Sequence, residues 1–260
     1  MAVPQGGHRR RSGDEANGPV EPDGLRVMVV GASSGIGYEV ARQLLEAGAS
    51  VAGGARRADR LDALAGAHPI QADVRDPAQC EQMVGRAAQV LGGLDALVYV
   101  AGITRITPLD SAGPAAWQEI FATNLFGAAA CTRAALPHLR ATSSRARALF
   151  ATSDSADLAY PGLVAYASSK AALGRFCQGL AAEFPEVSVS ELVVGPTVGT
   201  EVSDGFAPDE LAQWGQLWYE GGYIRYGLQE VADAAATIVD AVLAEAPAPR
   251  VEVLVPAPPG

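Results

Sequence analysis

Short apolar runs alternate with segments of helical period along most of this chain. The runs are rich in Val, Leu and Ala, which is typical of strands buried on both faces of a sheet. Repetition of strand and helix predicts an α/β fold, a single Rossmann-type doubly wound parallel β-sheet of about seven strands flanked by helices. The predicted strands include 25–30, 50–54, 94–100, 147–152, 187–194 and 251–255, and the predicted helices include 37–48, 77–92, 115–139 and 231–246.

The alternation of predicted strands and helices also predicts the domain organisation. No Pro- or Ser-rich linker and no fixed-period repeat interrupts it, so one domain is predicted over residues 24–260. Residues 1–23 are rich in Gly and Pro, and we interpret them as a disordered N-terminal tail. The alternation of strands and helices stops at 199–228, where aromatic residues lie among glycines. A loop-helix insertion there would cover the carboxyl ends of the strands, so we predict a small substrate lid.

Charge and composition exclude several classes of protein. The net charge is -10, and the basic run His8–Arg11 has no apolar stretch behind it, which argues against nucleic acid, secretion and a membrane and favours a cytoplasmic protein. Cys80, Cys131 and Cys177 have neither C-x-x-C spacing nor a His pair, so no disulfide framework and no metal site is expected. The three histidines lie near no nucleophile motif, which excludes a Ser-His-Asp hydrolase.

A glycine-rich segment follows the first predicted strand and opens the first helix. Glycines let the backbone turn tightly and approach a pyrophosphate, while the helix amino terminus offers N–H groups and a positive dipole. An ordinary Gly-rich turn would look similar, but the position after a strand favours nucleotide binding. The predicted phosphate-binding residues are Gly31, Ser33, Ser34, Gly35, Ile36 and Gly37.

The end of the second strand indicates which nucleotide is bound. An NAD site commonly has a carboxylate there for the ribose 2′-hydroxyl, whereas this chain has Ala55 followed by Arg56 and Arg57. Two guanidinium groups suit a 2′-phosphate, so NADP(H) is the predicted cofactor. The alternatives are that both arginines are solvated surface charge, and that the cofactor is NAD, since Asp59 and Asp62 lie nearby.

Ala72–Val74 closes the third predicted strand, where the adenine would lie. Asp73 could make a polar contact there and Val74 could form an apolar wall. An ordinary junction between strand and helix would have the same sequence.

Tyr166 and Lys170 are spaced four residues apart, and Lys170 is the only lysine among 260 residues. On a helix this spacing places a phenol beside an ammonium group. Lowering the pKa of a tyrosine from about 10 to roughly 7 requires about 4 kcal/mol, and a tyrosine so tuned can exchange a proton with a substrate oxygen. Ser168 and Ser169, between the two residues, are interpreted as ordinary helix positions.

Ser153 lies thirteen residues before Tyr166, at a strand end, and Asn124 lies in the long helical segment 115–139. Each could merely cap a turn or bond to backbone. Together with the glycine motif and Tyr166-x-x-x-Lys170, their order makes the chain resemble a classical short-chain dehydrogenase/reductase from about residue 25 to 255.

The resemblance implies a role for each matching residue. Tyr166 would be the general acid/base, Ser153 would polarise the carbonyl, Lys170 would contact the nicotinamide ribose and lower the tyrosine pKa, and Asn124 would hold a water in a proton relay. A homotetramer or homodimer is also implied. The remaining cofactor contacts implied are Arg56 and Arg57 at the 2′-phosphate, Asp73 and Val74 at the adenine, and Ala101, Gly102, Gly195, Thr197 and Thr200.

The chain departs from the family pattern at two places. Val30 and Tyr99–Gly102, reading "YVAG", replace polar residues that commonly tie two strands together, so apolar packing is expected on both sides. The nicotinamide turn reads Val194-Gly195-Pro196, and either Thr197 or Thr200 could contact the carboxamide.

The predicted function is NADPH-dependent reduction of a ketone to a secondary alcohol, with Tyr166 as proton donor. The alternatives are an NAD-dependent alcohol dehydrogenase of the same family and a non-catalytic nucleotide-sensing protein. Aromatic residues of the lid favour a small-molecule substrate that is bulky and apolar or aromatic, although they could equally pack the lid onto the body or an oligomer interface.

Overall fold

The computed structural model describes residues 23–142, 145–201, 206 and 208–256. Almost all of the predicted tail and residues 202–205 and 207 of the predicted lid lie outside this part. Seven parallel strands form the central sheet, in the order β10-β6-β5-β4-β1-β2-β3. Their bounds are β1 (Arg26–Val30), β2 (Ser50–Ala55), β3 (His68–Gln71), β4 (Ala96–Tyr99), β5 (Arg147–Ala151), β6 (Ser188–Val194) and β10 (Arg250–Val253).

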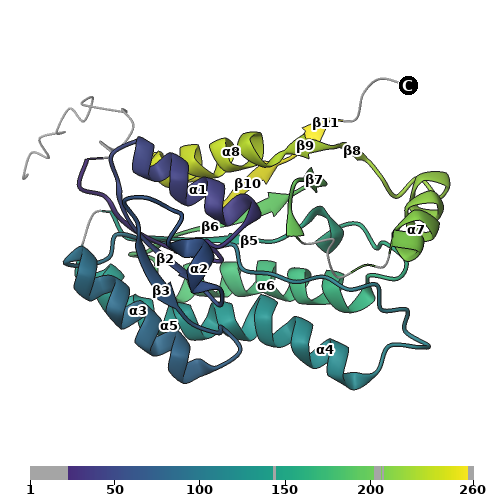
Figure 1. Ribbon diagram of the computed structural model, residues 1–260, viewed down its shortest axis with the longest axis horizontal. Coiled ribbons are helices and arrows are strands. Elements are labelled where there is room, and N and C mark those ends of the chain that lie inside the picture. The colour runs from purple at the N-terminus through teal and green to yellow at the C-terminus, as the bar shows by residue number, and fades with distance from the viewer. Residues whose placement is uncertain (1–22, 143–144, 202–205, 207, 257–260) are drawn as a thin grey trace, which may run out of the picture.

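Helices cover both faces of this sheet, as Figure 1 shows. One face carries α1 (Gly35–Glu46) and α8 (Val231–Leu243), and the other carries α3 (Pro77–Leu91), α5 (Gly127–Arg140) and α6 (Val164–Glu183). The four-residue α2 (Ala58–Leu61) follows β2. The predicted fold class, a doubly wound Rossmann-type sheet, is confirmed.

Successive side chains along each strand point to opposite faces of the sheet, so each face has its own hydrophobic core. In β1, Val27 and Val29 face the α1 and α8 layer, while Met28 and Val30 face the opposite layer, and all four are completely buried. Burial on both faces explains why the strands are continuous apolar runs in the sequence.

The helical segment predicted at 115–139 consists of three pieces. It begins with α4 (Pro114–Phe121), continues as a π-helical turn, η1 (Ala122–Phe126), and ends with α5. The Gly127 amide reaches back five residues to the Ala122 carbonyl. A π turn inside a helix is commonly found at functional sites, and this one contains Asn124.

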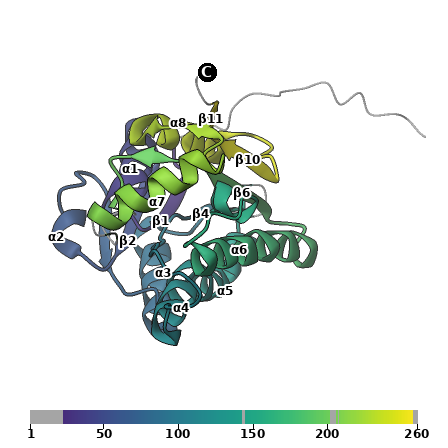
Figure 2. The ribbon, with the colours of Figure 1, turned by 90° about the vertical axis from the view of Figure 1, so that its right-hand side faces the viewer.

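The segment after β6 forms a separate small structure. The short strand β7 (Thr197–Val198) pairs with β9 (Gln229–Glu230), and β8 (Tyr226–Gly227) pairs with β11 (Val255–Pro256). Between them in the sequence, α7 (Pro208–Glu220) lies at one end of the molecule, apart from both helix layers in Figure 1 and facing the viewer in Figure 2.

Aromatic contacts fix α7 to the body. Trp218 donates its indole N–H to the Pro161 carbonyl at 2.8 Å and stacks edge-on against Tyr160, with ring centroids 5.7 Å apart. The aromatic residues of the lid were expected either to contact a substrate or to pack the lid onto the body or an oligomer interface. Trp218 packs onto the body.

Within the ranges described above, no helix is both long and apolar enough to cross a membrane.

Candidate active site

A cavity of about 600 Å³ opens at the carboxyl ends of β1, β2 and β4. Ligands of open parallel sheets bind at this edge. The cavity is lined by these predicted cofactor residues: Gly31, Ser33, Ser34, Gly35, Ile36, Gly37, Arg56, Arg57, Val74, Ala101, Gly102 and Thr200. It is also lined by residues without a predicted role: Gly54, Ala55, Ala72, Val100, Ile103, Arg105, Thr123 and Glu201.

Two glycines of the motif are required by close backbone approach. Gly31 has φ +99°, and a Cβ there would lie 2.7 Å from the Ala101 amide nitrogen. A Cβ on Gly37 would overlap the Gly31 carbonyl oxygen. At these two positions no side chain separates the amino terminus of α1 from the cavity. This arrangement fits the phosphates of a dinucleotide.

The Ser34 hydroxyl at the start of α1 is not used to cap that helix. It donates instead to Glu201 at 2.9 Å. Glu201 also pairs with Arg57 and Arg60, and the Arg57 hydrogen bond, with help from Arg60 and Ser34, lowers the pKa of its carboxyl group to about 2. A carboxylate thus lies where arginines and a helix amino terminus converge, in the position an anionic cofactor group would take.

The sequence analysis missed Glu201 and Arg60. Glu201 directly follows Thr200, but more than a hundred residues separate it from Arg57 and Arg60. Only the fold brings them together, and no local pattern could have indicated the contact.

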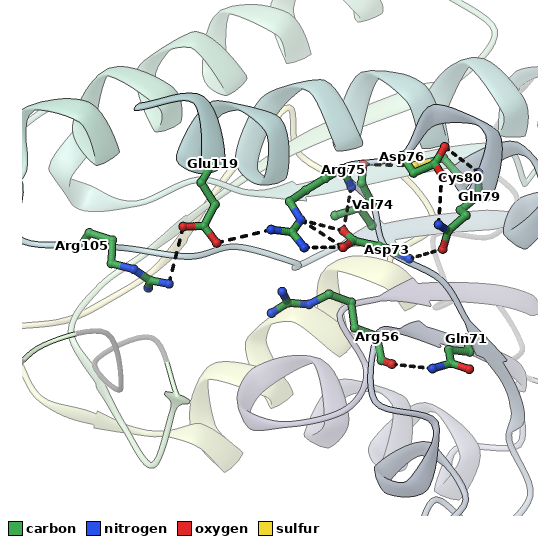
Figure 3. Close-up of polar contacts among 10 residues, drawn as sticks. All are labelled: Arg56, Gln71, Asp73, Val74, Arg75, Asp76, Gln79, Cys80, Arg105 and Glu119. Atoms are coloured by element: carbon green, nitrogen blue, oxygen red, sulfur yellow. Dashed lines mark hydrogen bonds and ion pairs between the residues drawn. The ribbon is translucent and has the colours of Figure 1, made fainter. Parts of the chain in front are cut away.

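Arg56 is the predicted arginine that points freely into the cavity. Its backbone carbonyl accepts a hydrogen bond from Gln71 at 3.0 Å, while Figure 3 shows its guanidinium extending beside Asp73 and Arg75. Within the described chain, this guanidinium has no carboxylate or carbonyl partner. Its positive charge contributes to the lowered pKa of Asp73, behind the larger effect of Arg75.

The Asp73 carboxylate, which was predicted to contact the adenine, already has a partner within the protein. Both of its carboxylate oxygens accept from the Arg75 guanidinium, at 2.6–3.0 Å, and its side chain does not line the cavity. Arg75 also forms an ion pair with Glu119 at 3.5 Å, and Glu119 forms an ion pair with Arg105 at 3.8 Å (Figure 3). A polar contact of Asp73 with the adenine stays a prediction, and a nucleotide there would meet a carboxylate that is already paired with Arg75.

Three predicted catalytic residues meet behind Gly102, on the cavity wall. A Cβ on Gly102 would lie 3.2 Å from Lys170 Nζ and 3.5 Å from Asn124 Oδ1. Lys170 donates to the Ala151 carbonyl at 2.7 Å, and its Nζ lies 5.7 Å from the centre of the Tyr166 ring. The predicted pairing of phenol and ammonium is present, on α6.

The pKa values of this pair differ from the expectation. Burial raises the pKa of Tyr166 to about 12, although a hydrogen bond with Ser153 opposes the rise. Burial also lowers the pKa of Lys170 to about 8. Desolvation disfavours the charged form of each group, so in the free protein it outweighs the lowering of the tyrosine pKa that was predicted.

The Asn124 side chain makes three hydrogen bonds within the protein. Its amide nitrogen donates to the Ile103 carbonyl at 3.0 Å and to Ser169 Oγ at 2.9 Å, and its Oδ1 accepts from the Ile103 amide at 2.9 Å. Both amide protons are therefore used, and only Oδ1 has a lone pair for a further donor. The interpretation of Ser169 as an ordinary helix position is wrong, since this fully buried hydroxyl joins α6 to the π turn.

Tyr99 also corrects the sequence analysis. Its ring is completely buried, but its hydroxyl donates to the Thr123 carbonyl at 2.6 Å, so this side of the strand pair is not apolar. A Cβ on Gly127 would lie 2.6 Å from that hydroxyl oxygen. Tyr99 therefore ties β4 to the π turn next to Asn124, and Gly127 leaves the room for it.

Two residues of the predicted nicotinamide turn, Thr197 and Thr200, were the candidates for contact with the carboxamide. Thr197 bonds to the Gly195 carbonyl at 2.9 Å and to Gln229 at 3.2 Å, and neither Thr197 nor Gly195 lines the cavity. Thr200 does line it. The geometry favours Thr200 for contact with a ligand.

A second hollow, of about 560 Å³, lies at the opposite edge of the sheet and includes Arg26, Asp95 and His138. None of the predicted site residues lines it, and Arg26 and Asp95 there are already paired at 2.8 Å. We do not assign the active site to this hollow, because parallel sheets bind ligands at the carboxyl ends of their strands.

Sequence order, sheet topology and the site together define a class of protein. A profile of the short chain dehydrogenase family matches residues 26–210. The chain therefore belongs to the short chain dehydrogenase family, as the resemblance predicted.

Curated relatives support this assignment. A short chain dehydrogenase of Pseudocercospora fijiensis is 36% identical over 197 residues, covering 72% of this chain and 63% of the relative. The 11-beta-hydroxysteroid dehydrogenase A of Sesamum indicum is 32% identical over 201 residues, covering 73% of this chain and 54% of the relative. The match spans less than two thirds of the length of either relative.

Solved structures share the fold. A short chain dehydrogenase from Burkholderia cenocepacia in complex with NADP superposes with a TM-score of 0.77 at 29% identity, covering 89% of this chain and 97% of that one. A short-chain type dehydrogenase/reductase from Mycobacterium marinum gives 0.77 at 26% identity, with 89% and 94% coverage.

Proposed function

We propose that this protein is an NADPH-dependent reductase that converts a ketone to a secondary alcohol. The observation that carries the proposal is the convergence of Lys170 and Asn124 behind Gly102, on the wall of the glycine-lined cavity, with the Tyr166 ring centre 5.7 Å from Lys170 Nζ and Ser153 hydrogen-bonded to Tyr166. When bound, a reduced nicotinamide cofactor supplies the hydride, and the protein positions it.

The residues of the site divide the remaining tasks. Tyr166 gives its phenolic proton to the substrate oxygen, and its raised pKa keeps that proton available at neutral pH. Ser153, hydrogen-bonded to Tyr166, orients the same oxygen. Lys170 is held against the Ala151 carbonyl, and an ammonium group has two further donors that can serve a ribose hydroxyl.

Arg56 supports NADP(H) as the cofactor, because its guanidinium extends into the cavity at the end of β2. A structurally similar relative is in complex with NADP. The alternative, an NAD-dependent alcohol dehydrogenase, is favoured by Glu201, which already neutralises part of the positive charge of Arg57 and Arg60.

The substrate that we propose is a bulky apolar or aromatic ketone. Aromatic residues of the lid lie beside Tyr166, in a cluster with Tyr160, Trp214 and Tyr223. One relative is named a hydroxysteroid dehydrogenase, which is consistent with a polycyclic substrate. A cytoplasmic location and a homodimer or homotetramer complete the proposal, on the composition and the family resemblance.

Oxidation of NADPH by a panel of ketones tests the reaction. Wild-type protein is expected to oxidise NADPH with at least one bulky ketone, and Tyr166→Phe should lose about 10²- to 10⁴-fold of that activity because the proton donor is gone. Tyr219→Phe is the matched control, since Tyr219 is 77% exposed on α7. Full activity of Tyr166→Phe would overturn the mechanism.

Binding of the two cofactors tests the cofactor choice. NADPH is expected to bind more tightly than NADH, and Arg56→Ala should remove most of that difference by deleting a charge beside the 2′-phosphate. Arg86→Ala, on the exposed side of α3, serves as the control. Equal affinities that Arg56→Ala leaves unchanged would instead establish the NAD-dependent alternative.

A further inference from the structure

Asp154 is a buried acid directly beside the proposed reaction centre. It follows Ser153 in the 3-10 turn η2 (Asp154–Ala156) and is 7% exposed. Its Oδ1 accepts from Ser153 Oγ at 3.0 Å and its Oδ2 accepts from Tyr160 Oη at 2.9 Å. Across the described ranges, no arginine or lysine pairs with it, although buried carboxylates usually have a cationic partner.

The hydrogen bonds of Ser153 leave its hydroxyl one orientation. An ionised carboxylate can only accept, so the single Ser153 proton lies on the bond to Asp154. Ser153 Oγ in turn accepts from Ser155 Oγ at 3.0 Å and from the Ser155 amide at 3.2 Å. Ser153 is therefore oriented by Asp154 and Ser155 before any substrate is bound.

We propose that Asp154 is a positioning residue for the Ser153 and Tyr166 pair: it fixes the position of Ser153 Oγ in the free protein and, through its negative charge, favours the phenol form of Tyr166. The phenol is the form that donates a proton, which reduction needs, whereas oxidation of an alcohol needs the phenolate. The inference deepens the proposed function and rests on it for the direction of the reaction.

Electrostatics agree with this geometry. The negative charge of Asp154 raises the pKa of Tyr166, on top of the larger effect of burial and against a hydrogen bond with Ser153. Burial raises the pKa of Asp154 itself, while the hydrogen bonds from Tyr160 and Ser153 favour its ionised form. The charge of Asp154 and the ammonium of Lys170 thus act on the tyrosine in opposite directions.

Other titratable groups approach this acid from several elements. Lys170 of α6 turns its Nζ to the Ala151 carbonyl, so it forms no ion pair with Asp154. Glu191 of β6 lies behind Thr152, whose hydroxyl donates to it at 3.0 Å. The remaining groups are Tyr160 and Asp157 on the loop around η2, Tyr166 on α6, Arg225 and Tyr226 near Tyr160, and Arg250 of β10.

Titration of Tyr166 in the cofactor-free protein tests the proposal directly. Tyrosines labelled with ¹³C at Cζ are followed by NMR up to pH 11, and Tyr166→Phe assigns the signal. In wild-type protein the Tyr166 signal should hardly titrate in this range, because its pKa is raised to about 12. In Asp154→Asn, the midpoint should fall by about one unit or more because a nearby negative charge is gone.

A matched acid on the same loop is the control. Asp157→Asn removes a carboxylate that pairs with Arg250 on the surface, and it should leave the Tyr166 signal unchanged. If Asp154→Asn does not fold, Asp154→Ala removes the same charge and carries the same expectation. A Tyr166 signal that titrates up to pH 11 as little in the folded Asp154 variant as in wild-type protein would overturn the proposal.

A kinetic comparison then separates this inference from the proposed function. With a ketone that wild-type protein reduces, the pH above which kcat/KM for reduction falls should be about one unit lower in Asp154→Asn than in wild-type protein, matching one unit in the tyrosine pKa. An unchanged pH profile would contradict the effect of Asp154 on Tyr166. Absence of any turnover by wild-type protein would instead contradict the proposed function and leave the NMR result standing.

Discussion

At the scale of single residues, the site depends on side chains with very little free space. Lys170 is 4% exposed, lies against Gly102 and Tyr166, and bonds to the Ala151 carbonyl. A compact ammonium group fits this space, whereas a planar guanidinium is larger and directs its donors differently. This explains why an otherwise arginine-rich chain contains a lysine here.

Lys170→Arg should reduce kcat/KM with NADPH and a ketone on the order of a hundredfold, because the guanidinium displaces Tyr166 or the cofactor. The melting temperature should fall by only a few degrees, as the charge is retained. Steady-state kinetics and calorimetry measure the two effects. Arg175→Lys, on the exposed face of α6, is the control, and a fully active Lys170→Arg would refute this role.

Stability should depend on pH through Lys170. Its pKa is about 8 in the folded protein and near 10.5 when exposed, so between these values the unfolded chain binds more protons and stability rises with pH. Urea unfolding should show that wild-type protein gains about 2 kcal/mol relative to Lys170→Met between pH 7 and 9.5. A constant difference would show that Lys170 has a normal pKa in the folded protein.

At the scale of elements, the site is assembled from segments that are distant in the sequence. The segment after β7 brings Glu201 to Ser34 at the start of α1 and to Arg57 after β2. The predicted lid and the predicted cofactor end are thereby in contact through one carboxylate. An anionic cofactor that binds these arginines must displace that carboxylate or share them with it.

Glu201→Gln should tighten NADPH binding by about three- to tenfold, since a competing negative charge is removed from exposed arginines. NADH should gain less, because it has no 2′-phosphate. Nucleotide fluorescence titration measures both dissociation constants. Glu46→Gln, which removes an exposed partner of Arg42 on α1, is the control, and weaker NADPH binding by Glu201→Gln would show that Glu201 helps to form the site.

At the scale of the whole molecule, two helix layers share one sheet, and the site lies at one edge of it. Phe150 of β5 is completely buried at the centre and contacts Phe176 of α6 edge-on, with centroids 5.5 Å apart. The same strand continues to Ser153, and the same helix carries Tyr166. Packing in the core therefore sets the distance between the catalytic side chains.

Phe150→Ala should lower the free energy of unfolding by about 3–5 kcal/mol, because it removes a large buried ring and leaves a cavity. Urea denaturation measures this loss. Phe126→Ala is the matched control, since Phe126 is 61% exposed and should cost less than about 1 kcal/mol. Similar losses for both variants would show that the core is not centred on Phe150.

The sequence by itself determined the parts that depend on local periodicity and spacing. Strands buried on both faces need continuous apolar runs, so the doubly wound sheet was predictable. Close backbone approach needs glycine, and a phenol beside an ammonium on a helix needs four-residue spacing, so Gly31, Gly37, Tyr166 and Lys170 were found as well.

Only the tertiary structure decided the partners of the polar groups. Asp73 was expected at the adenine but pairs with Arg75, and Tyr99 was expected to pack as an apolar residue but bonds to Thr123. Glu201 and Asp154 had no local signal at all. A hydrogen bond or ion pair depends on which groups the fold brings within about 3 Å, and this information is distributed over the whole chain.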